Sequence, residues 1–225
     1  MDIFCDIMKL AGSLICHQLP ERSIYAEGMP LPLCARDTGI YLGVFTVVLF
    51  SMLFRRMGSD RQPSLPYAIL LCLMMVPMMV DGTGSYLGLY ITNNTARLFT
   101  GVFFGMPLGM FLIPIAHFKI SGINKKRFLN NPLELAGIVA AGAMLCLAVL
   151  KCSIPWTVTS AVIIGSMLFL IGRVIYTLIC LAWKGNGSLI FIKTAGAMTC
   201  VLFVMYLLSN HVFRAIESYF TGALR

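Results

Sequence analysis

Charged side chains are scarce in this sequence. Asp, Glu, Lys and Arg make up 12% of its 225 residues, against about 25% in a typical soluble domain. Acidic residues are the rarest, with 9 Asp and Glu against 17 Lys and Arg, which gives a net charge of +8. Flexible linkers, internal repeats and low-complexity runs are also lacking. These absences exclude an ordinary soluble protein and a string of separate modules, and they leave a single domain, 1–225.

The chain is instead rich in apolar residues. They make up 59% of the chain, and the mean hydropathy is +0.87. A transmembrane helix needs roughly 20 apolar residues, and six stretches qualify: 39–54, 66–90, 95–117, 133–151, 156–182 and 189–207. The sequence therefore predicts an all-α fold, a polytopic membrane helix bundle of about six transmembrane helices in the cell membrane, with the lipid bilayer as its surroundings.

Both ends of the chain have the pattern of short amphipathic helices. Asp2, Asp6, Lys9 and Ser13 recur at helical spacing opposite an apolar face, which favours a helix lying in the membrane interface. The C-terminal segment 208–225 has a similar pattern. We therefore expect three parts: an amphipathic helix and Cys/His loop over 1–38, a six-span bundle over 39–207, and an interfacial helix over 208–225.

The distribution of charge between the spans predicts their orientation. The connections after the first and third spans are rich in Lys and Arg and the one after the fifth contains Lys184, whereas residues 1–38 carry three bases and five acids. Because basic loops stay in the cytoplasm, both termini are expected on the extracytoplasmic side. The positive charge is then mainly a topology signal, and nucleic acid is not an expected partner.

The loop near the N-terminus concentrates residues that bind metals. Cys16 and His17 precede a stretch rich in Pro and Gly, and Cys34 and Asp37 follow it. Thiolate, imidazole and carboxylate are the usual ligands of zinc and related divalent ions. If the loop folds back and the first helix ends by Cys16, the four side chains form a site for a divalent metal, with zinc the favoured ion.

Two other interpretations of the cysteines remain open. On an oxidising face, Cys16 and Cys34 can form a disulfide that staples the loop without any catalysis, or both can be unpaired bystanders. The cysteines inside apolar runs behave as small hydrophobic side chains.

The residues at both ends of this loop resemble a known family. "CHQLPERS" and "LPLCARDTGIYLG", together with Asp81 and a later Asn94, Arg97, Thr100 and Gly101 pattern, are similar to the signature of a prokaryotic integral membrane family catalogued as domain of unknown function 2085. The resemblance implies a membrane protein and provides no established activity. Family members usually have Cys-x-x-Cys where this chain has Cys34-x-x-Asp37. Asp37 cannot resolve a mixed disulfide, so this difference weakens a local redox motif more than a metal site.

Polar residues within the spans suggest a second part of the site. Asp81 and Arg97 are ionisable groups in apolar runs, where they need partners or water. A direct Asp81–Arg97 salt bridge is one interpretation. The other is an outward-facing cavity in which Asp81 and Arg97 are catalytic, Arg36 and Asn94 hold a phosphate or carboxylate, and Tyr41 lies at the rim.

Two classes of function fit these residues. The first is a metalloenzyme acting at the outer leaflet on a lipid-like substrate, or on one with a phosphate or carboxylate, with the metal activating water or polarising an oxygen. The second is a transporter or metal-handling protein with a path along Asp81, Arg97 and Arg173. The clustering of polar groups at one face favours the enzyme, and the oligomeric state is left open.

Overall fold

The computed structural model describes residues 2–118, 123–151, 153–182 and 187–209. The chain begins with helix α1 (Asp2–Ser13), a one-turn 3-10 helix (Pro20–Arg22) and strands β1 (Ser23–Ala26) and β2 (Met29–Cys34). Six longer helices follow: α2 (Ala35–Leu53), α3 (Leu65–Tyr86), α4 (Asn94–Ile115), α5 (Pro132–Leu150), α6 (Trp156–Ala182) and α7 (Gly187–Leu207).

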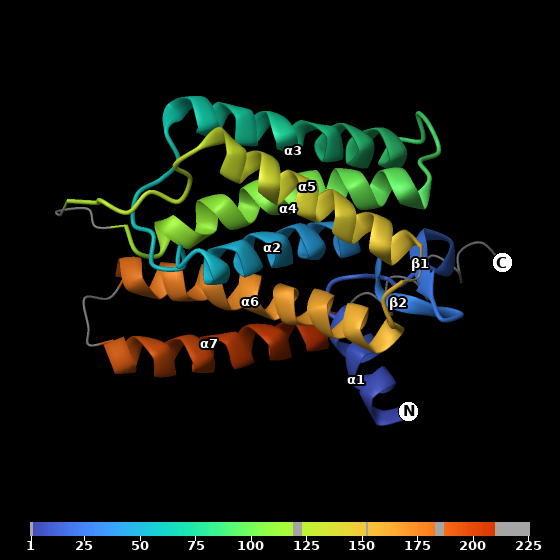
Figure 1. Cartoon of the computed structure of the whole chain (residues 1–225). Helices are drawn as coiled ribbons and strands as arrows, with labels where there is room; N and C mark the ends of the chain where they lie inside the picture. Colours follow the sequence, from blue (N-terminus) through green and yellow to red (C-terminus); the bar gives the residue numbers. More distant parts are fainter. Residues whose placement is uncertain (1, 119–122, 152, 183–186, 210–225) are drawn as a thin grey trace.

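These six helices confirm the predicted bundle. Each is long and apolar enough to cross a membrane, and successive helices run in opposite directions (Figure 1). The outermost helices bury little within the protein, with 11% of the α3 window and 6% of the α7 window buried. Their large exposed apolar side chains therefore suit contact with lipid. The C-terminal helix expected over 208–225 lies almost entirely outside the described residues.

The two ends of the bundle differ in structure and charge. Helix α1 and the two strands lie at the end where α2 begins (Figure 1). Ser209, just after α7, reaches the same end, where its hydroxyl donates a hydrogen bond to the carbonyl of Ser13 at 2.8 Å. The connections that contain Arg55, Arg56 and Lys125–Arg127 lie at the opposite end. The charge asymmetry of the sequence is thus an asymmetry between the two ends of the fold.

Helices α2 and α4 form the centre of the bundle because glycines allow their backbones to touch. A Cβ on Gly105 would lie 2.0 Å from the carbonyl oxygen of Ile40, and one on Gly39 would lie 2.2 Å from that of Leu98. Small residues let membrane helices approach in this way. The close approach fixes the start of α2, and with it Cys34 and the residues that follow.

The β-hairpin is a departure from the predicted all-α fold. Strands β1 and β2 are antiparallel, with Ala26 opposite Met29, and the connecting Glu27 and Gly28 both have positive φ, 51° and 77°. Two such residues form the tight turn that suits the twist of a hairpin. Pro30 and Pro32 favoured an irregular loop in the sequence, but a strand at a sheet edge tolerates proline because its outer N–H positions need no partner.

Candidate metal centre

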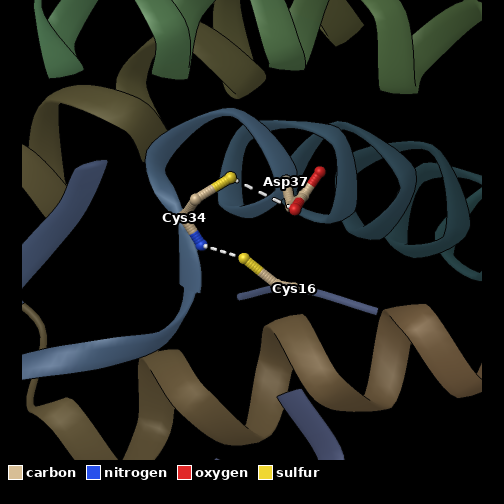
Figure 2. Close-up of side chains that lie close together, drawn as sticks. All are labelled: Cys16, Cys34 and Asp37. Carbon is tan, nitrogen blue, oxygen red and sulfur yellow. Dashed lines mark hydrogen bonds between the residues drawn. The ribbon is translucent and has the colours of Figure 1, made fainter. Parts of the chain in front are cut away.

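Three of the four predicted metal ligands converge at the hairpin end of the bundle. One ligating atom from each of Cys16, Cys34 and Asp37 lies within 4.8 Å of the other two, and all three residues are partly buried. Figure 2 shows the two sulfurs and the carboxylate facing a common point. The Cys34 thiol donates a hydrogen bond to Asp37 Oδ2 at 3.1 Å, and the Cys34 backbone N–H donates one to Cys16 Sγ at 3.3 Å.

Local structure explains why these residues meet. Helix α1 ends at Ser13 and a turn follows it, so Cys16 lies beyond the helix, as a shared site with the strands requires. Cys34 occupies the N-cap position of α2, and Asp37 lies in the first turn of that helix. An acidic side chain is favourable there because it faces the positive end of the helix dipole.

Gln18 holds the two halves of the cluster together. Its side-chain N–H groups donate to the carbonyl of Lys9 at 2.7 Å and to that of Pro32 at 2.9 Å. These bonds link the end of α1 to β2 and so bring Cys16 to Cys34. This role of Gln18 is not evident from composition or spacing, although Gln18 lies inside the "CHQLPERS" motif, and its position two residues after Cys16 is the available signal.

The two thiols have opposite acid–base properties. A hydrogen bond with Cys34 lowers the pKa of Cys16 to about 7, against the opposing effects of burial and of the nearby Asp37 charge. The same interaction, together with burial and the Asp37 charge, raises the pKa of Cys34. The pair therefore favours one thiolate, on Cys16, with Cys34 protonated.

His17 is placed apart from these three residues. Its side chain is exposed, and the group of close ligating atoms contains Cys16, Cys34 and Asp37 without it. Tyr41 lies one turn after Asp37 on α2, is partly buried against the core, and is close enough to interact electrostatically with Asp37. It thus lies beside the cluster.

The buried polar groups form pairs other than the Asp81–Arg97 bridge considered from the sequence. The guanidinium of Arg36 pairs with the carboxylate of Asp81, whose other oxygen accepts a hydrogen bond from the Thr92 hydroxyl at 2.7 Å. Arg97 instead donates to Asn94 Oδ1 at 3.3 Å. Thr92 was not identified from the sequence, because a threonine in a short connection gives no distinguishing signal.

Asn94 connects these paired polar residues (Arg36, Asp81, Thr92 and Arg97, together with Asn94, called the buried polar layer below) to the hairpin. Its amide N–H groups donate to the carbonyls of Glu21 and Ser23, each at 3.1 Å. Arg97, 8% exposed, supports Asn94 from below. Asn94, predicted to hold a substrate anion, thus fixes the hairpin to α4, and through the hairpin the position of Cys34.

The donor set suits a divalent ion. Around a tetrahedral zinc, two thiolate sulfurs at about 2.3 Å from the metal lie about 3.8 Å apart, so atoms within 4.8 Å of one another reach that geometry through small side-chain rotations. Two sulfurs and one oxygen leave a fourth position for water or substrate, a pattern typical of catalytic rather than closed structural zinc sites.

The fold and this cluster define a class: a multi-pass helical membrane protein with a Cys/Cys/Asp group at one end of its bundle. The chain belongs to the family described as "Predicted membrane protein (DUF2085)", whose model matches residues 16–111. That range begins at Cys16 and includes every residue of the cluster and of the buried polar layer.

Two archaeal relatives carry the same region. An uncharacterised protein of Methanocaldococcus jannaschii is 35% identical over 103 residues, which are 46% of this chain and 64% of the relative. An uncharacterised protein of Methanothermobacter thermautotrophicus is 33% identical over 103 residues, 46% of this chain and 88% of the relative. No solved structure matches.

Proposed function

We propose that this protein is a membrane-embedded metalloenzyme that holds one divalent ion, zinc, between Cys16, Cys34 and Asp37. The convergence of these three ligating atoms within 4.8 Å is the observation that carries the proposal. The ligands come from two separate segments and are held by Gln18 and by the N-terminus of α2. Preorganised ligands of this kind make metal binding favourable, because the fold has already restricted their motion.

The open fourth position supports an enzyme over a structural site. A metal-bound water or a substrate oxygen occupies this position in hydrolytic metal sites. Water or a substrate oxygen is the proposed fourth ligand, since the cluster itself supplies three. The cluster lies at the hairpin end of the spanning helices, where lipid headgroups are found. The proposed substrate is therefore lipid-like, with a phosphate or carboxylate group near the ion.

The buried pairs weigh against the transporter alternative. Asp81 pairs with Arg36 and Arg97 with Asn94, and Arg173 donates to the carbonyl of Ile113 at 2.9 Å. Charged groups that line a transport path need to exchange partners with a passing ion, whereas these have local partners that stabilise the bundle.

The orientation of the bundle is part of the proposal. The basic connections suggest that the opposite end, with the hairpin and cluster, faces outward. The ion and its substrate would then meet at the outer leaflet, with both chain termini on that side.

Elemental analysis of the purified protein tests the metal site. We expect about one zinc per chain in the unsubstituted protein, because the cluster offers one set of ligands, and loss of it in Cys16→Ser, Cys34→Ser and Asp37→Asn. Cys72→Ser is the matched control, since Cys72 is exposed on α3 and should keep the metal.

The same samples test the disulfide alternative. A metal-free protein with Cys16 joined to Cys34 would refute the metal site. If the metal is present, turnover of a panel of membrane lipids by protein in liposomes tests the enzyme. Uptake of an ion or solute that depends on the cluster, without turnover, would reject the enzyme in favour of transport.

A further inference from the structure

A second polar cavity lies at the basic end of the bundle, away from the metal cluster. It has a volume of about 300 Å³ and is formed by the connections that follow α2 and α4. Its lining comprises five cationic side chains with an aromatic ring, a hydroxyl and an amide: Arg55, Arg56, Lys125, Lys126, Arg127, Phe54, Ser59 and Asn130. Among the residues that the structure describes, no carboxylate contributes to this lining.

Backbone hydrogen bonds hold the two walls of this basic cavity together. The N–H groups of Asp60 and Arg61 both donate to the carbonyl of Lys126 at 3.1 Å, and the Lys126 N–H donates to Asp60 Oδ1 at 2.7 Å. Arg56 donates to the carbonyl of Arg127 at 3.2 Å. These bonds engage only the backbone groups of Lys126 and Arg127, so they do not occupy the charged side chains of these two residues.

The positive charge of the cavity is largely uncompensated. Arg56 forms an ion pair with Glu134 at 3.0 Å. Over the part of the chain that the structure describes, no acidic side chain lies within ion-pair distance of Arg55, Lys125, Lys126 or Arg127. Four cations around one small cavity repel one another, and a bound anion would relieve that repulsion.

The backbone of Arg55 gives an independent reason to expect a ligand. This residue follows α2 with φ at +54°, a left-handed conformation that is roughly 1–2 kcal/mol unfavourable for a residue with a Cβ. Glycine is the usual residue at such a position after a helix. An arginine there places a cation at the cavity at the expense of local stability, as residues at binding sites often do.

We propose that this basic cavity binds a phosphate group, supplied by the headgroup of an anionic phospholipid. Arginine and lysine side chains are the usual partners of phosphate oxygens. The cavity lies beyond the ends of spanning helices, at the level where lipid headgroups are found, and basic cavities between such helices suit anionic headgroups. Inorganic phosphate is the other source of the same chemistry, and the experiment separates the two.

Native mass spectrometry of the full chain in detergent tests this site. The probes are phosphatidylglycerol, phosphatidylcholine with the same acyl chains, and inorganic phosphate. We expect phosphatidylglycerol to bind in preference to phosphatidylcholine. The double substitution Lys126→Gln with Arg127→Gln should weaken binding roughly 30-fold, since each cation near a headgroup contributes about 1 kcal/mol.

Two further variants make the result specific. The double substitution Lys9→Gln with Lys151→Gln removes the same charge from exposed positions at the hairpin end and should leave binding unchanged. Arg55→Gly should raise the melting temperature of the lipid-free protein, because it relieves the left-handed strain, while it weakens binding of phosphatidylglycerol. If Arg55 had only a structural role, Arg55→Gly would not weaken the binding of phosphatidylglycerol.

The outcomes separate clearly. Equal binding of the two lipids, or equal weakening by the hairpin-end control, would overturn the proposal. Binding of inorganic phosphate without phosphatidylglycerol would overturn the lipid source and support the phosphate chemistry. Because Arg55, Lys126 and Arg127 lie at the opposite end of the bundle from Cys16 and Cys34, the zinc content should stay unchanged in their variants, so this test is independent of the proposed enzyme.

Discussion

Arg36 of α2 and Asp81 of α3 form a partly buried ion pair although they are 45 positions apart in the chain. Asp37, the next residue after Arg36, faces a different side of α2, toward the two cysteines, because neighbouring helical residues point about 100° apart. One short motif thus fixes α2 to α3 on one side and completes the metal cluster on the other. The ion pair is therefore expected to determine where the cluster lies.

Removal of either partner of this pair should destabilise the bundle. Asp81→Asn or Arg36→Met leaves the other charge buried, which typically costs about 3–5 kcal/mol. The pair of substitutions Arg36→Met and Asp81→Leu together should recover much of the loss, since neither charge then remains. Unfolding of the purified protein in detergent measures the effect, with Lys151→Met at an exposed position as the control. Single substitutions without effect would contradict this role.

Loss of the Asn94 side chain should loosen the hairpin. Asn94→Ala removes two hydrogen bonds to the carbonyls of Glu21 and Ser23, about 1 kcal/mol each, and should speed backbone hydrogen exchange across 16–34. Asn93→Ala is the matched control. Asn93 accepts from the Ala96 N–H at 2.7 Å as the N-cap of α4, so its loss should destabilise α4 without faster exchange in the hairpin. Identical hydrogen-exchange profiles for Asn94→Ala and Asn93→Ala would contradict the role of Asn94 in holding the hairpin.

The contact between α2 and α4 predicts a contrast between two glycines. Gly105→Ala places a methyl group 2.0 Å from the Ile40 carbonyl, and overpacking of this kind costs roughly 1–3 kcal/mol or more. Gly137 on α5 has open space around the same position, so Gly137→Ala should be neutral or stabilise the helix by up to about 1 kcal/mol. Thermal unfolding in detergent measures both. A neutral Gly105→Ala would contradict the close packing.

The proposed orientation predicts which end of the bundle is accessible from outside. Glu21→Cys lies at the hairpin end and Ser64→Cys at the basic end, both at exposed positions. A membrane-impermeant maleimide applied to intact cells should add label to Glu21→Cys above the unsubstituted protein, and should label Ser64→Cys only after the cells are lysed. The reverse pattern would place the cluster in the cytoplasm.

Much of the fold could be read from the sequence because membrane helices depend on length and hydrophobicity. All six spans were expected within a few residues of their observed ends, including the first, expected at 39–54 and found at Ala35–Leu53. The hairpin was missed because Pro30 and Pro32 argue against a strand, and the short turn at Glu27–Gly28 carries a weak signal.

The candidate site was only partly predictable for a similar reason. The motif spacing indicated that Cys16 and Cys34 come together, and the structure brings them together. The partners of the buried charges depend on how α2, α3 and α4 pack, which periodicity does not determine. Arg36 was therefore expected to bind substrate but pairs with Asp81, and Gln18, whose contacts join distant segments, was overlooked.

X-ray absorption at the zinc edge of the purified protein tests the central claim most directly. Coordination by Cys16, Cys34 and Asp37 predicts a first shell of two sulfurs at about 2.3 Å and two lighter atoms at about 2.0–2.2 Å, one of them from water. Cys34→Ser should lower the sulfur count to one in any zinc that remains. A shell without sulfur, or one with four sulfurs, would contradict the site.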